Sequence, residues 1–480
     1  MKKIIKKTSW ILLIFMILVI AGFVAAKNNL ISVKKTFSQK TISPNTFTLP
    51  NKQTLTSPVN LCNIKNFGAV ANEYSKAKEN RRAIQKAITE CVNSDHGLFI
   101  PSGTWYTGSL YFNKDNSWLI IDPQATLSFI YDPELYKPLR PSRFEGYELI
   151  NFSAPLYFDN IAGGGIIGGG KIKIEEPKKW HHWDKYENTA KKQLLKFSKE
   201  VIPLANRIFG KVSDGLRPPF VQLYNTQNFV LDNIRVQDST MWTIHCLYSN
   251  NILIQNLNIY TDGSNTDGIV IDSSSYITLK NNTLRTGDDA IVLKSGSDED
   301  GRRVNKPTKN IIIQDTVVND AHGGIVIGSE MTGGIENVAI KNTTIIKADV
   351  GLRIKTRPGR GGYIRNINLD KLNADETRSD LFRINAHYRQ SIGQGDILSE
   401  LYPEIENITF NNVTANKVLR TFMINGFTNH PIKNINLSNI TVTTQQKTSK
   451  IKNTTNKKLQ NINISFENNT RKDKELIKYE

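Results

Sequence analysis

The 480-residue sequence predicts an all-β protein, a right-handed parallel β-helix in which successive coils of chain stack on one another. Two observations carry this prediction. A short phrase recurs every few dozen residues from residue 228 onward, and within each copy apolar and polar residues alternate with the period of a strand and not of a helix. The alternative, a β-sandwich, would place a turn every 8 to 12 residues or so, well under the observed spacing.

The recurring phrase is rich in Ile, Val and Asn, as in "NILIQNLNI", "NIIIQDTVV" and "NINLSNITV". Its copies are separated by 23, 25, 34, 27, 29, 41, 27 and 27 residues, and they begin at Asn228, Asn251, Tyr276, Asn310, Asn337, Asn366, Asn407, Asn434 and Asn461. A period of this length indicates stacked copies of one structural unit.

The N-terminus has the layout of an export signal. Four early lysines precede an apolar run from Trp10 to Ala26, and Val24 and Ala26 suit the small-residue positions before a cleavage site. The run is also close to the length of a membrane span, about 20 residues. Residues 1–26 are therefore predicted to be a signal peptide or an uncleaved membrane anchor, and in either case the protein is exported, whether secreted or periplasmic.

The rest of the chain divides by its patterning. Residues 27–57 are expected to be a flexible leader, residues 58–442 the β-helix, and residues 443–480 a final coil with a flexible basic tail. Residues 78–91 have apolar residues at helical spacing, which predicts a short helix that caps the N-terminal end of the solenoid. Residues 130–158 and 175–219 interrupt the coils as long insertions, the second with a helix over 189–208, and such insertions usually shape a binding face.

Cysteine usage and net charge restrict the disulfide pairing and the class of binding partner that we expect. Of three cysteines, Cys62 and Cys91 are expected to pair and tie the first strand to the first helix, which leaves Cys246 as a buried thiol. The net charge of +18 suits a polyanionic partner, although a Lys-rich composition alone could produce it. Because the chain is exported, an acidic polysaccharide is favoured over nucleic acid and anionic lipid, and we expect a monomer. No cysteine and histidine spacing typical of a metal site is present.

Laying four coils in register gathers polar residues at one place. "DGIVID", "DAIVLK", "GGIVIG" and "VGLRIK" align so that two columns of Ile and Leu point inward, while the column beginning at Val270 points outward. The strand starts then bring together Asp267, Asp288, Asp289 and His322, with Arg353 and Lys355 beside them. A lone Asp is usually a turn former and a lone Arg or Lys is usually solvated, so the argument depends on their convergence.

Three neighbouring carboxylates favour general acid and base chemistry, because mutual repulsion raises the pKa of at least one and keeps a proton available. Cleavage of a glycosidic bond needs one group to protonate the leaving oxygen and another to activate water. Arg353 and Lys355 would hold an acidic substrate by its carboxylate.

Four short segments on successive coils resemble the signature of glycoside hydrolase family 28, the polygalacturonases. They are "NTD" at 265–267, "GDD" at 287–289, "HGG" with "IGS" from His322, and "RIK" at 353–355. "RFEG", "LRPPFVQLYN", "WTIH", "SGSDEDGRR" and "GSEMTGG" are similar to the bacterial exo-acting branch, and the resemblance covers roughly residues 60–440.

The resemblance implies a role for each matching residue. Asp288 would be the general acid, Asp267 and Asp289 would position and deprotonate water with inversion at the anomeric carbon, and His322 would tune the acid through hydrogen bonding. Asn265, Arg353 and Lys355 would bind substrate, the last two through the galacturonate carboxylate. Neither a metal nor an organic cofactor is implied. Two positions depart from the pattern: Val270, where the family often has Asp, and Ala321, where it usually has Gly.

The predicted function is hydrolysis of α-1,4-galacturonosyl linkages in polygalacturonate or its oligomers, exo-acting because the two insertions could close one end of a groove. Three alternatives stay open: hydrolysis of another pectic polymer such as rhamnogalacturonan or xylogalacturonan, a Ca²⁺-dependent pectate lyase, and a non-catalytic polysaccharide-binding β-helix. Three tryptophans are candidates for sugar stacking or for purely structural packing: Trp180, Trp183 and Trp242.

Overall fold

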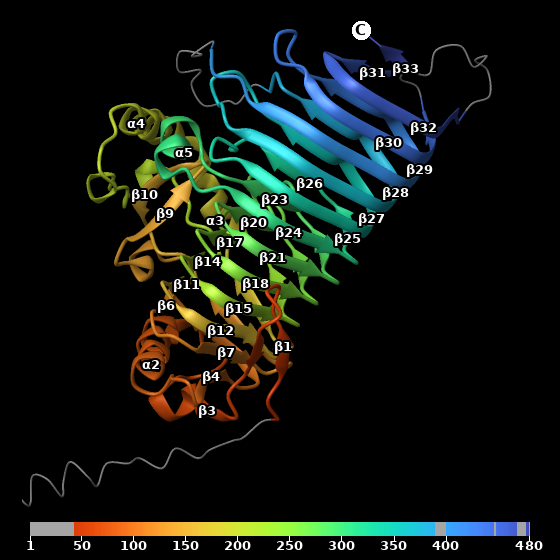
Figure 1. Ribbon diagram of the computed structural model, residues 1–480. Coiled ribbons are helices and arrows are strands. Elements are labelled where there is room, and N and C mark those ends of the chain that lie inside the picture. The colour runs from red at the N-terminus through yellow and green to blue at the C-terminus, as the bar shows by residue number, and fades with distance from the viewer. Residues whose placement is uncertain (1–42, 389–399, 446–447, 468–476, 480) are drawn as a thin grey trace, which may run out of the picture. The chain divides into compact units, whose positions relative to one another are not determined.

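A computed structural model describes residues 43–388, 400–445, 448–467 and 477–479, all within one unit, Thr41–Glu480. One large parallel sheet winds through this unit as stacked coils, so the fold is the predicted right-handed parallel β-helix (Figure 1). The predicted signal or anchor at residues 1–26 and the first part of the predicted leader, residues 27–42, lie outside the described residues. No helix among the described residues is long and apolar enough to span a membrane.

Each coil contributes one strand to each of three faces. The first face stacks β3 (Asn60–Asn63), β4 (His96–Ile100), β7 (Ser117–Ile121), β12 (Ala162–Ile167), β15 (Gln227–Asp232), β18 (Asn250–Gln255), β21 (Ser275–Lys280) and β24 (Thr308–Gln314). The second stacks β5 (Gly103–Thr107), β8 (Ala125–Phe129), β13 (Lys171–Ile174), β16 (Arg235–Gln237), β19 (Asn258–Tyr260), β22 (Thr283–Arg285) and β25 (Val317–Asp320). The third stacks β6 (Leu110–Phe112), β11 (Leu156–Asp159), β14 (Val221–Tyr224), β17 (Ile244–Leu247), β20 (Ile269–Asp272), β23 (Ile291–Lys294) and β26 (Gly323–Gly328).

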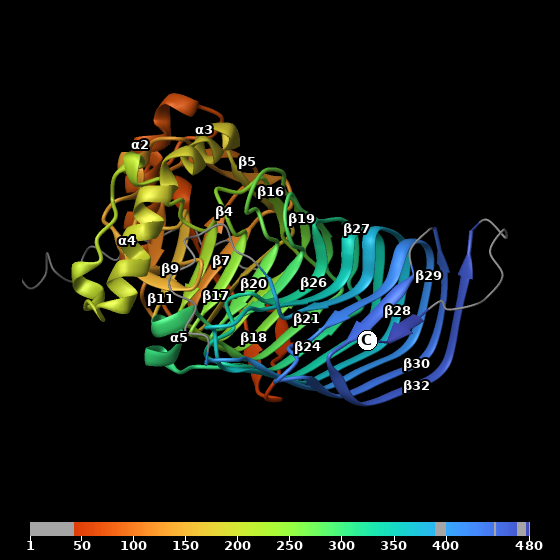
Figure 2. The ribbon, with the colours of Figure 1, turned by 90° about the horizontal axis from the view of Figure 1, so that it is seen from above.

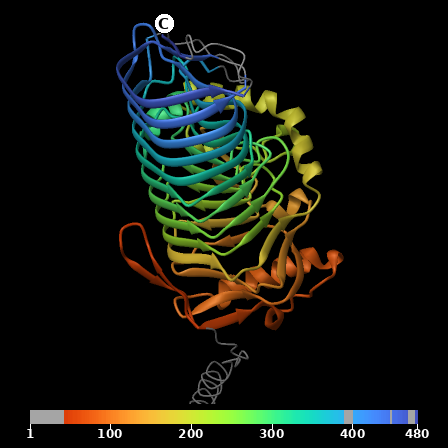
Figure 3. The same ribbon diagram turned by 90° about the vertical axis from the view of Figure 1, so that its right-hand side faces the viewer.

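In the later coils one long bent strand replaces the three separate strands of each coil. β27 (Ile335–Lys355), β28 (Tyr363–Asn385) and β29 (Glu404–Asn425) each cover all three faces. The last coils divide again, with β30 (Ile432–Thr444) and β32 (Thr454–Phe466) on the first two faces and β31 (Ser449–Lys452) and β33 (Ile477–Tyr479) on the third. Figure 3 shows the coils stacked from the N-terminal end to the C-terminal end.

The register confirms the predicted repeat in all but its last step. Residues at the Asn position stack from coil to coil, as when Asn366 donates from Nδ2 to Asn337 Oδ1 at 2.9 Å and Asn434 donates to Asn407 at 2.8 Å. These asparagines have positive φ, which Asn tolerates better than most residues. The final coil is shorter than predicted: Asn456, not Asn461, bonds to Asn434, and Ile440 pairs with Ile462.

The N-terminal helix is α2 (Ala77–Glu90), which matches the prediction to within a residue. Ala83, Ile84, Ala87 and Ile88 are buried in the core that runs through the solenoid, so the helix covers the first coils as a cap (Figure 3). The predicted disulfide between Cys62 and Cys91 is present, and Cys246 is free and buried. Burial raises the pKa of the Cys246 thiol to about 12, so it carries no thiolate chemistry.

The predicted flexible leader is wrong where the structure describes it, and so is part of the predicted flexible tail, whereas the final coil predicted within residues 443–480 is present. In the leader, β1 (Thr46–Thr48) and β2 (Thr54–Thr56) form an antiparallel hairpin. Alternation places Phe47 on one side of β1, where it buries against Trp118 on the outside of the first face. At the other end, β31 and β32 continue the coils through residues 449–466, because Ile451 and half-buried Leu459 still extend the inward columns.

The two insertions contain more structure than predicted. The first holds the hairpin of β9 (Arg140–Phe144) and β10 (Tyr147–Asn151) after a 3₁₀ turn, Pro133–Tyr136. The second holds α3 (Pro177–His181) and α4 (Glu187–Lys199), with 3₁₀ turns at His182–Tyr186, Leu204–Asn206 and Val212–Asp214. The predicted helix over 189–208 ends early because Val201 has φ of 51° and Pro203 follows it.

A third short helix, α5 (Asp298–Val304), packs against both insertions. Its Asp300 is buried and accepts from Arg207 Nη1 at 2.5 Å and from the Glu148 backbone at 2.8 Å. One carboxylate thereby joins α5, the hairpin and the second insertion. Figure 2 shows α3, α4 and α5 gathered on the N-terminal half, and the described residues beyond Val304 contain no helix.

Candidate active site

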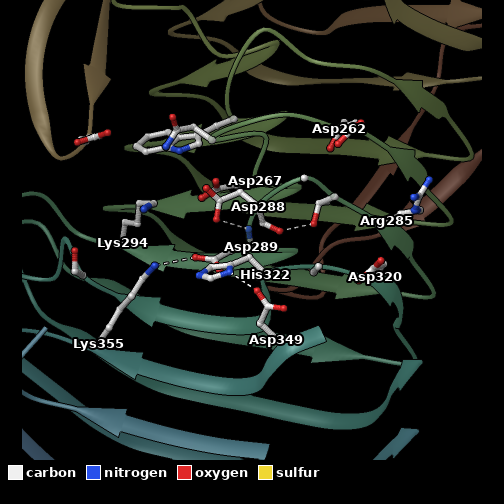
Figure 4. Close-up of a pocket in the computed structure, with 18 of the residues that line it drawn as sticks. Asp262, Asp267, Arg285, Asp288, Asp289, Lys294, Asp320, His322, Asp349 and Lys355 are labelled. Carbon is white, nitrogen blue, oxygen red and sulfur yellow. Dashed lines mark hydrogen bonds and ion pairs between the residues drawn. The ribbon is translucent and has the colours of Figure 1, made fainter. Parts of the chain in front are cut away.

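A cavity of about 550 Å³ opens on the third face at β17, β20, β23 and β26 (Figure 4). Six of the seven predicted site residues line it, namely Asn265, Asp267, Asp288, Asp289, His322 and Lys355. Arg353 lies directly behind this lining, where its Nη1 donates to His322 Nε2 at 3.1 Å. The structure thus brings together every side chain that the coil alignment placed at one site.

The backbone of the coils explains this convergence. Strand register pairs Ile269 with Ile291 and Ile291 with Ile325, as the alignment predicted. Just before these strands the ladder continues, since Gly268 N donates to Asp289 O at 2.9 Å and His322 N donates to Asp288 O at 3.1 Å. Residues one coil apart therefore lie one strand spacing apart, about 4.8 Å.

Asp289 is the ionised carboxylate of the site. It is buried, and its Oδ2 accepts from Lys355 Nζ at 2.9 Å. Burial alone would raise its pKa, but the charge and hydrogen bond of Lys355, together with the electrostatic effects of Arg353 and His322, outweigh burial and hold the pKa below its usual range. Its other oxygen, Oδ1, is buried with no hydrogen-bond partner in the protein, so it can accept a proton or a hydrogen bond from a bound molecule.

Asp267 and Asp288 have the opposite electrostatics. Burial and then the negative charge of Asp288 raise the pKa of Asp267 well above its usual value. Burial and then Asp289 raise the pKa of half-buried Asp288. Because the three carboxyl groups are coupled, the site retains a proton on Asp267 or Asp288 at a pH where Asp289 has lost its own.

His322 lies between a carboxylate and a guanidinium. Its Nδ1 is 2.6 Å from Asp349 Oδ2, and Arg353 donates to Nε2, so these contacts fit a neutral ring with its proton on Nδ1. Asp349 is held in turn by Arg378, which also binds Asp320 Oδ1 at 2.8 Å. The expected side-chain hydrogen bond from His322 to the acid is not formed, since both ring nitrogens are engaged elsewhere.

Sequence reasoning left several lining residues without a role. Lys294 is the last residue of the aligned segment "DAIVLK", and in the structure its Nζ binds Glu330 at 2.9 Å and lies 4.7 Å from the centre of the Trp242 ring. Tyr388 also lines the cavity, with Lys355 Nζ 5.4 Å from its ring centre. The columns of the repeat could locate Lys294, whereas Tyr388 follows β28 in a segment without a repeat signal.

The tryptophans separate into two kinds. Trp180 and Trp183 of the second insertion are fully buried against Tyr131 and Tyr136 of the first, which makes them structural. Trp242 is buried but reaches the cavity wall, so it alone of the three keeps a possible sugar contact. Asn265 accepts from Arg217 Nη2 at 2.9 Å, which fixes the side chain at the cavity edge.

Val270, the departure from the family pattern, does not line the cavity. It is fully buried in a second apolar cluster that joins the outward face of β20 to the insertions. The cluster comprises Phe144, Tyr147, Leu149, Ala190, Leu194, Phe209, Leu216, Met241, Trp242, Val270, Val292 and Val326. Two residues on, Asp272 is also buried and accepts from Arg143 Nη1 at 2.6 Å, so this carboxylate anchors the β9–β10 hairpin.

The arrangement can perform acid and base chemistry on an anionic substrate. It holds one ionised carboxylate with a spare oxygen, two carboxyls of raised pKa, and the cations Lys294, Arg353 and Lys355. In the described ranges no group of three or more His, Cys, Asp and Glu side chains is arranged to hold a metal ion.

Comparisons with known proteins agree with this geometry. The family model described as "Glycosyl hydrolases family 28" matches residues 210–460. A probable polygalacturonase of Vitis vinifera is 27% identical over 76% of this chain and 70% of its own length. An exo-poly-alpha-D-galacturonosidase of Dickeya chrysanthemi is 27% identical over 72% of this chain and 60% of its own length. Among solved structures, a hyperthermoactive exopolygalacturonase from Thermotoga maritima aligns with a TM-score of 0.79 at 29% identity, covering 88% of this chain and 94% of that one.

Proposed function

The chain belongs to glycoside hydrolase family 28, and on that premise we propose that it hydrolyses α-1,4-galacturonosyl linkages of polygalacturonate from a chain end. The observation that carries the proposal is the carboxyl triad beside Lys355 and Arg353. Three carboxyls of divergent pKa supply acid and base, and the cations suit the carboxylate of a uronate.

The proposed reaction is a single displacement with inversion. Asp288 donates its proton to the glycosidic oxygen as the bond to the anomeric carbon breaks, and a water oxygen attacks that carbon from the opposite face. The water's proton goes to Asp289, whose Oδ1 has no partner in the protein, while Asp267 orients the water. The pKa directions are consistent with this division of roles, since Asp289 is ionised while the pKa values of Asp288 and Asp267 are both raised, so that Asp288 can hold the acid proton.

End-wise action is supported by where the insertions pack. Glu145, at the tip of the β9–β10 hairpin, lines the cavity, and the hairpin is anchored by the buried Arg143 and Asp272 pair. The names of the Dickeya and Thermotoga relatives point the same way. A cavity bounded at one end by such a hairpin accommodates a chain terminus more readily than a continuous polymer.

Chromatography of early products from polygalacturonate tests the proposal. End-wise hydrolysis predicts one short product from the first minutes, together with new reducing ends and no rise in ultraviolet absorbance. A ladder of oligomers would overturn end-wise action, and absorbance that disappears with a chelator would replace hydrolysis by a lyase reaction. Activity confined to rhamnogalacturonan or xylogalacturonan would move the substrate to another pectic polymer.

Asp288→Asn separates catalysis from binding. We expect its turnover to fall about a thousandfold, because the amide cannot donate the acid proton, while polygalacturonate binding persists. Asp262→Asn is the matched control, since Asp262 also lines the cavity but lies outside the triad. Wild-type binding without any bond cleavage would instead indicate a non-catalytic polysaccharide-binding protein.

We also infer that the protein acts outside the cytoplasm, as a monomer on pectic polysaccharide and not on nucleic acid. The disulfide between Cys62 and Cys91 supports this, because disulfides persist in oxidising compartments. Fractionation followed by N-terminal sequencing tests export and distinguishes a cleaved signal from a membrane tether. Recovery of the intact chain in the cytoplasm would overturn export.

A further inference from the structure

The outward column of the third face changes character after the cavity. Through β20, β23 and β26 it holds Val270, Val292 and Val326, and strand register then continues it as Arg353, Arg383, Met423, Lys450 and Lys478. The neighbouring outward column continues from Lys355 through Asn385 and Asn425 to Lys452. The face that holds the active site therefore extends toward the C-terminal end as a row of cations.

We call the cations of these two columns beyond Lys355, together with Arg420, which pairs with Asp380, the basic track: Arg383, Arg420, Lys450, Lys452 and Lys478. Within the track, Arg383 and Arg420 both bind the buried carboxylate of Asp380. Among the described residues from 432 onward, Glu467 is the only acidic residue. Counted over the described residues, the track therefore carries more cations than carboxylates.

The side chains of the track reach the surface of the described part of the chain. Arg383, Arg420, Lys450 and Lys452 are half-buried and Lys478 is exposed. No helix or insertion of the described chain covers these coils, which Figure 2 shows beyond β27, away from α3, α4 and α5. Three strand spacings separate the coil of Lys355 from the coil of Lys452, which is about 14 Å. A chain leaving the cavity along this face would reach the track directly.

We propose that the basic track binds the stretch of polygalacturonate that extends out of the active site, so that the enzyme holds long anionic chains more tightly than short ones. This inference rests on the proposed function, which supplies the polyanion. The hairpin borders the cavity at Glu145, so the rest of the polymer would leave on the other side, over the C-terminal coils. Regularly spaced cations suit a polymer that carries a carboxylate on each sugar unit.

The test compares two triple variants of the full chain that carry the same charge change. Lys450→Glu/Lys452→Glu/Lys478→Glu reverses the track, and Lys433→Glu/Lys457→Glu/Lys458→Glu reverses three lysines of the same terminal coils on the first face. The measurement is the ratio of kcat/KM on polygalacturonate to kcat/KM on digalacturonate. We expect the ratio to fall about tenfold in the track variant, the sum of several weak surface ion pairs, and to stay within about twofold in the control.

The dependence of the kcat/KM ratio on ionic strength is a second test of the track. At high ionic strength the difference between wild type and the track variant should shrink, because salt screens exposed charges. An equal fall in both variants would mean that net charge alone matters and would overturn the track, as would no fall in either. The corresponding Lys→Gln variants, which keep much of each aliphatic stem, answer the same question if charge reversal impairs folding.

The experiments distinguish failure of the proposed function from failure of the basic track. If the wild type cleaves neither substrate, retardation of each variant in a gel containing polygalacturonate, measured in an Asp288→Asn background, still reports on the track. Weaker retardation of the track variant alone supports it, and equal retardation of both variants overturns it. Cleavage of both substrates with an unchanged ratio overturns the track while leaving the hydrolase intact.

Discussion

The covered and uncovered coils use the same strand positions in opposite ways. Beneath the insertions the outward column is apolar and fully buried, with Val270, Val292 and Val326 packed against the hairpin and α4. Beyond them the same column carries Arg383 and Lys450. Outward positions of a solenoid thus have no fixed character, and the element that covers them decides whether they act as core or as charged surface.

The largest difference between the two regions should be in how much an ion pair contributes to the free energy of unfolding. The side chains of Arg143 and Asp272 are both inaccessible to solvent. Arg143→Ala therefore leaves the buried Asp272 carboxylate without its cation. We expect a loss of about 3 to 5 kcal/mol in the free energy of unfolding. Arg365→Ala breaks the half-exposed pair with Glu336 in the uncovered coils and should cost about 0.5 kcal/mol. Urea denaturation of both variants gives the comparison, and equal losses would contradict it.

A charge introduced into the outward column should lower the free energy of unfolding strongly only where the insertions cover that column. Val270→Asp introduces the residue that the family often has at this position, but here it would be buried among apolar side chains. We expect a loss of about 3 kcal/mol in unfolding free energy. Met423→Asp in the same column would stand between Arg383 and Lys450 and should change stability by less than about 1 kcal/mol. A mild effect of Val270→Asp would mean that the hairpin opens easily.

At the edge between the regions, Asp349 should matter through His322. Asp349→Asn weakens the charge-assisted hydrogen bond to His322 Nδ1, and we expect kcat/KM to fall about tenfold, with partial recovery in Asp349→Glu. Asp320→Asn also loses a contact with Arg378 but does not touch His322, so it should retain activity to within about twofold. Similar losses in both variants would assign the effect to Arg378 instead.

The smallest expected effect is a pH-dependent change in melting temperature when Asp267 of the carboxyl triad is replaced. A raised pKa means that folded Asp267 binds a proton more readily than unfolded Asp267, so its contribution to stability falls as pH rises through the folded pKa. Asp267→Asn removes this loss, and we expect a melting temperature about 1 to 2 °C higher at neutral pH, with the gain vanishing in acid. Thermal unfolding from pH 4 to pH 8 measures it, and a variant that is less stable at neutral pH would contradict the assignment.

Sequence alone determined the coil, its columns and the convergence of the site, because a parallel solenoid converts a repeat period directly into a spatial register. Ile269, Ile291 and Ile325 stack as aligned, and Asp267, Asp289 and His322 meet because each precedes a stacked strand. The last step failed, with Asn461 in place of Asn456, because the final coil is half-exposed and its weakened apolar pattern no longer defines the register.

Only the tertiary structure decided what lies over the coils. Nothing in the sequence around Asp272 names Arg143 as its partner, since 129 residues separate them and the contact depends on how the hairpin folds back. The same holds for Glu145 at the cavity and for Asp349 beside His322. Periodicity reports which way a side chain points, whereas the charge state of Asp289, the burial of Val270 and the exposure of Lys478 depend on neighbours that no local pattern encodes.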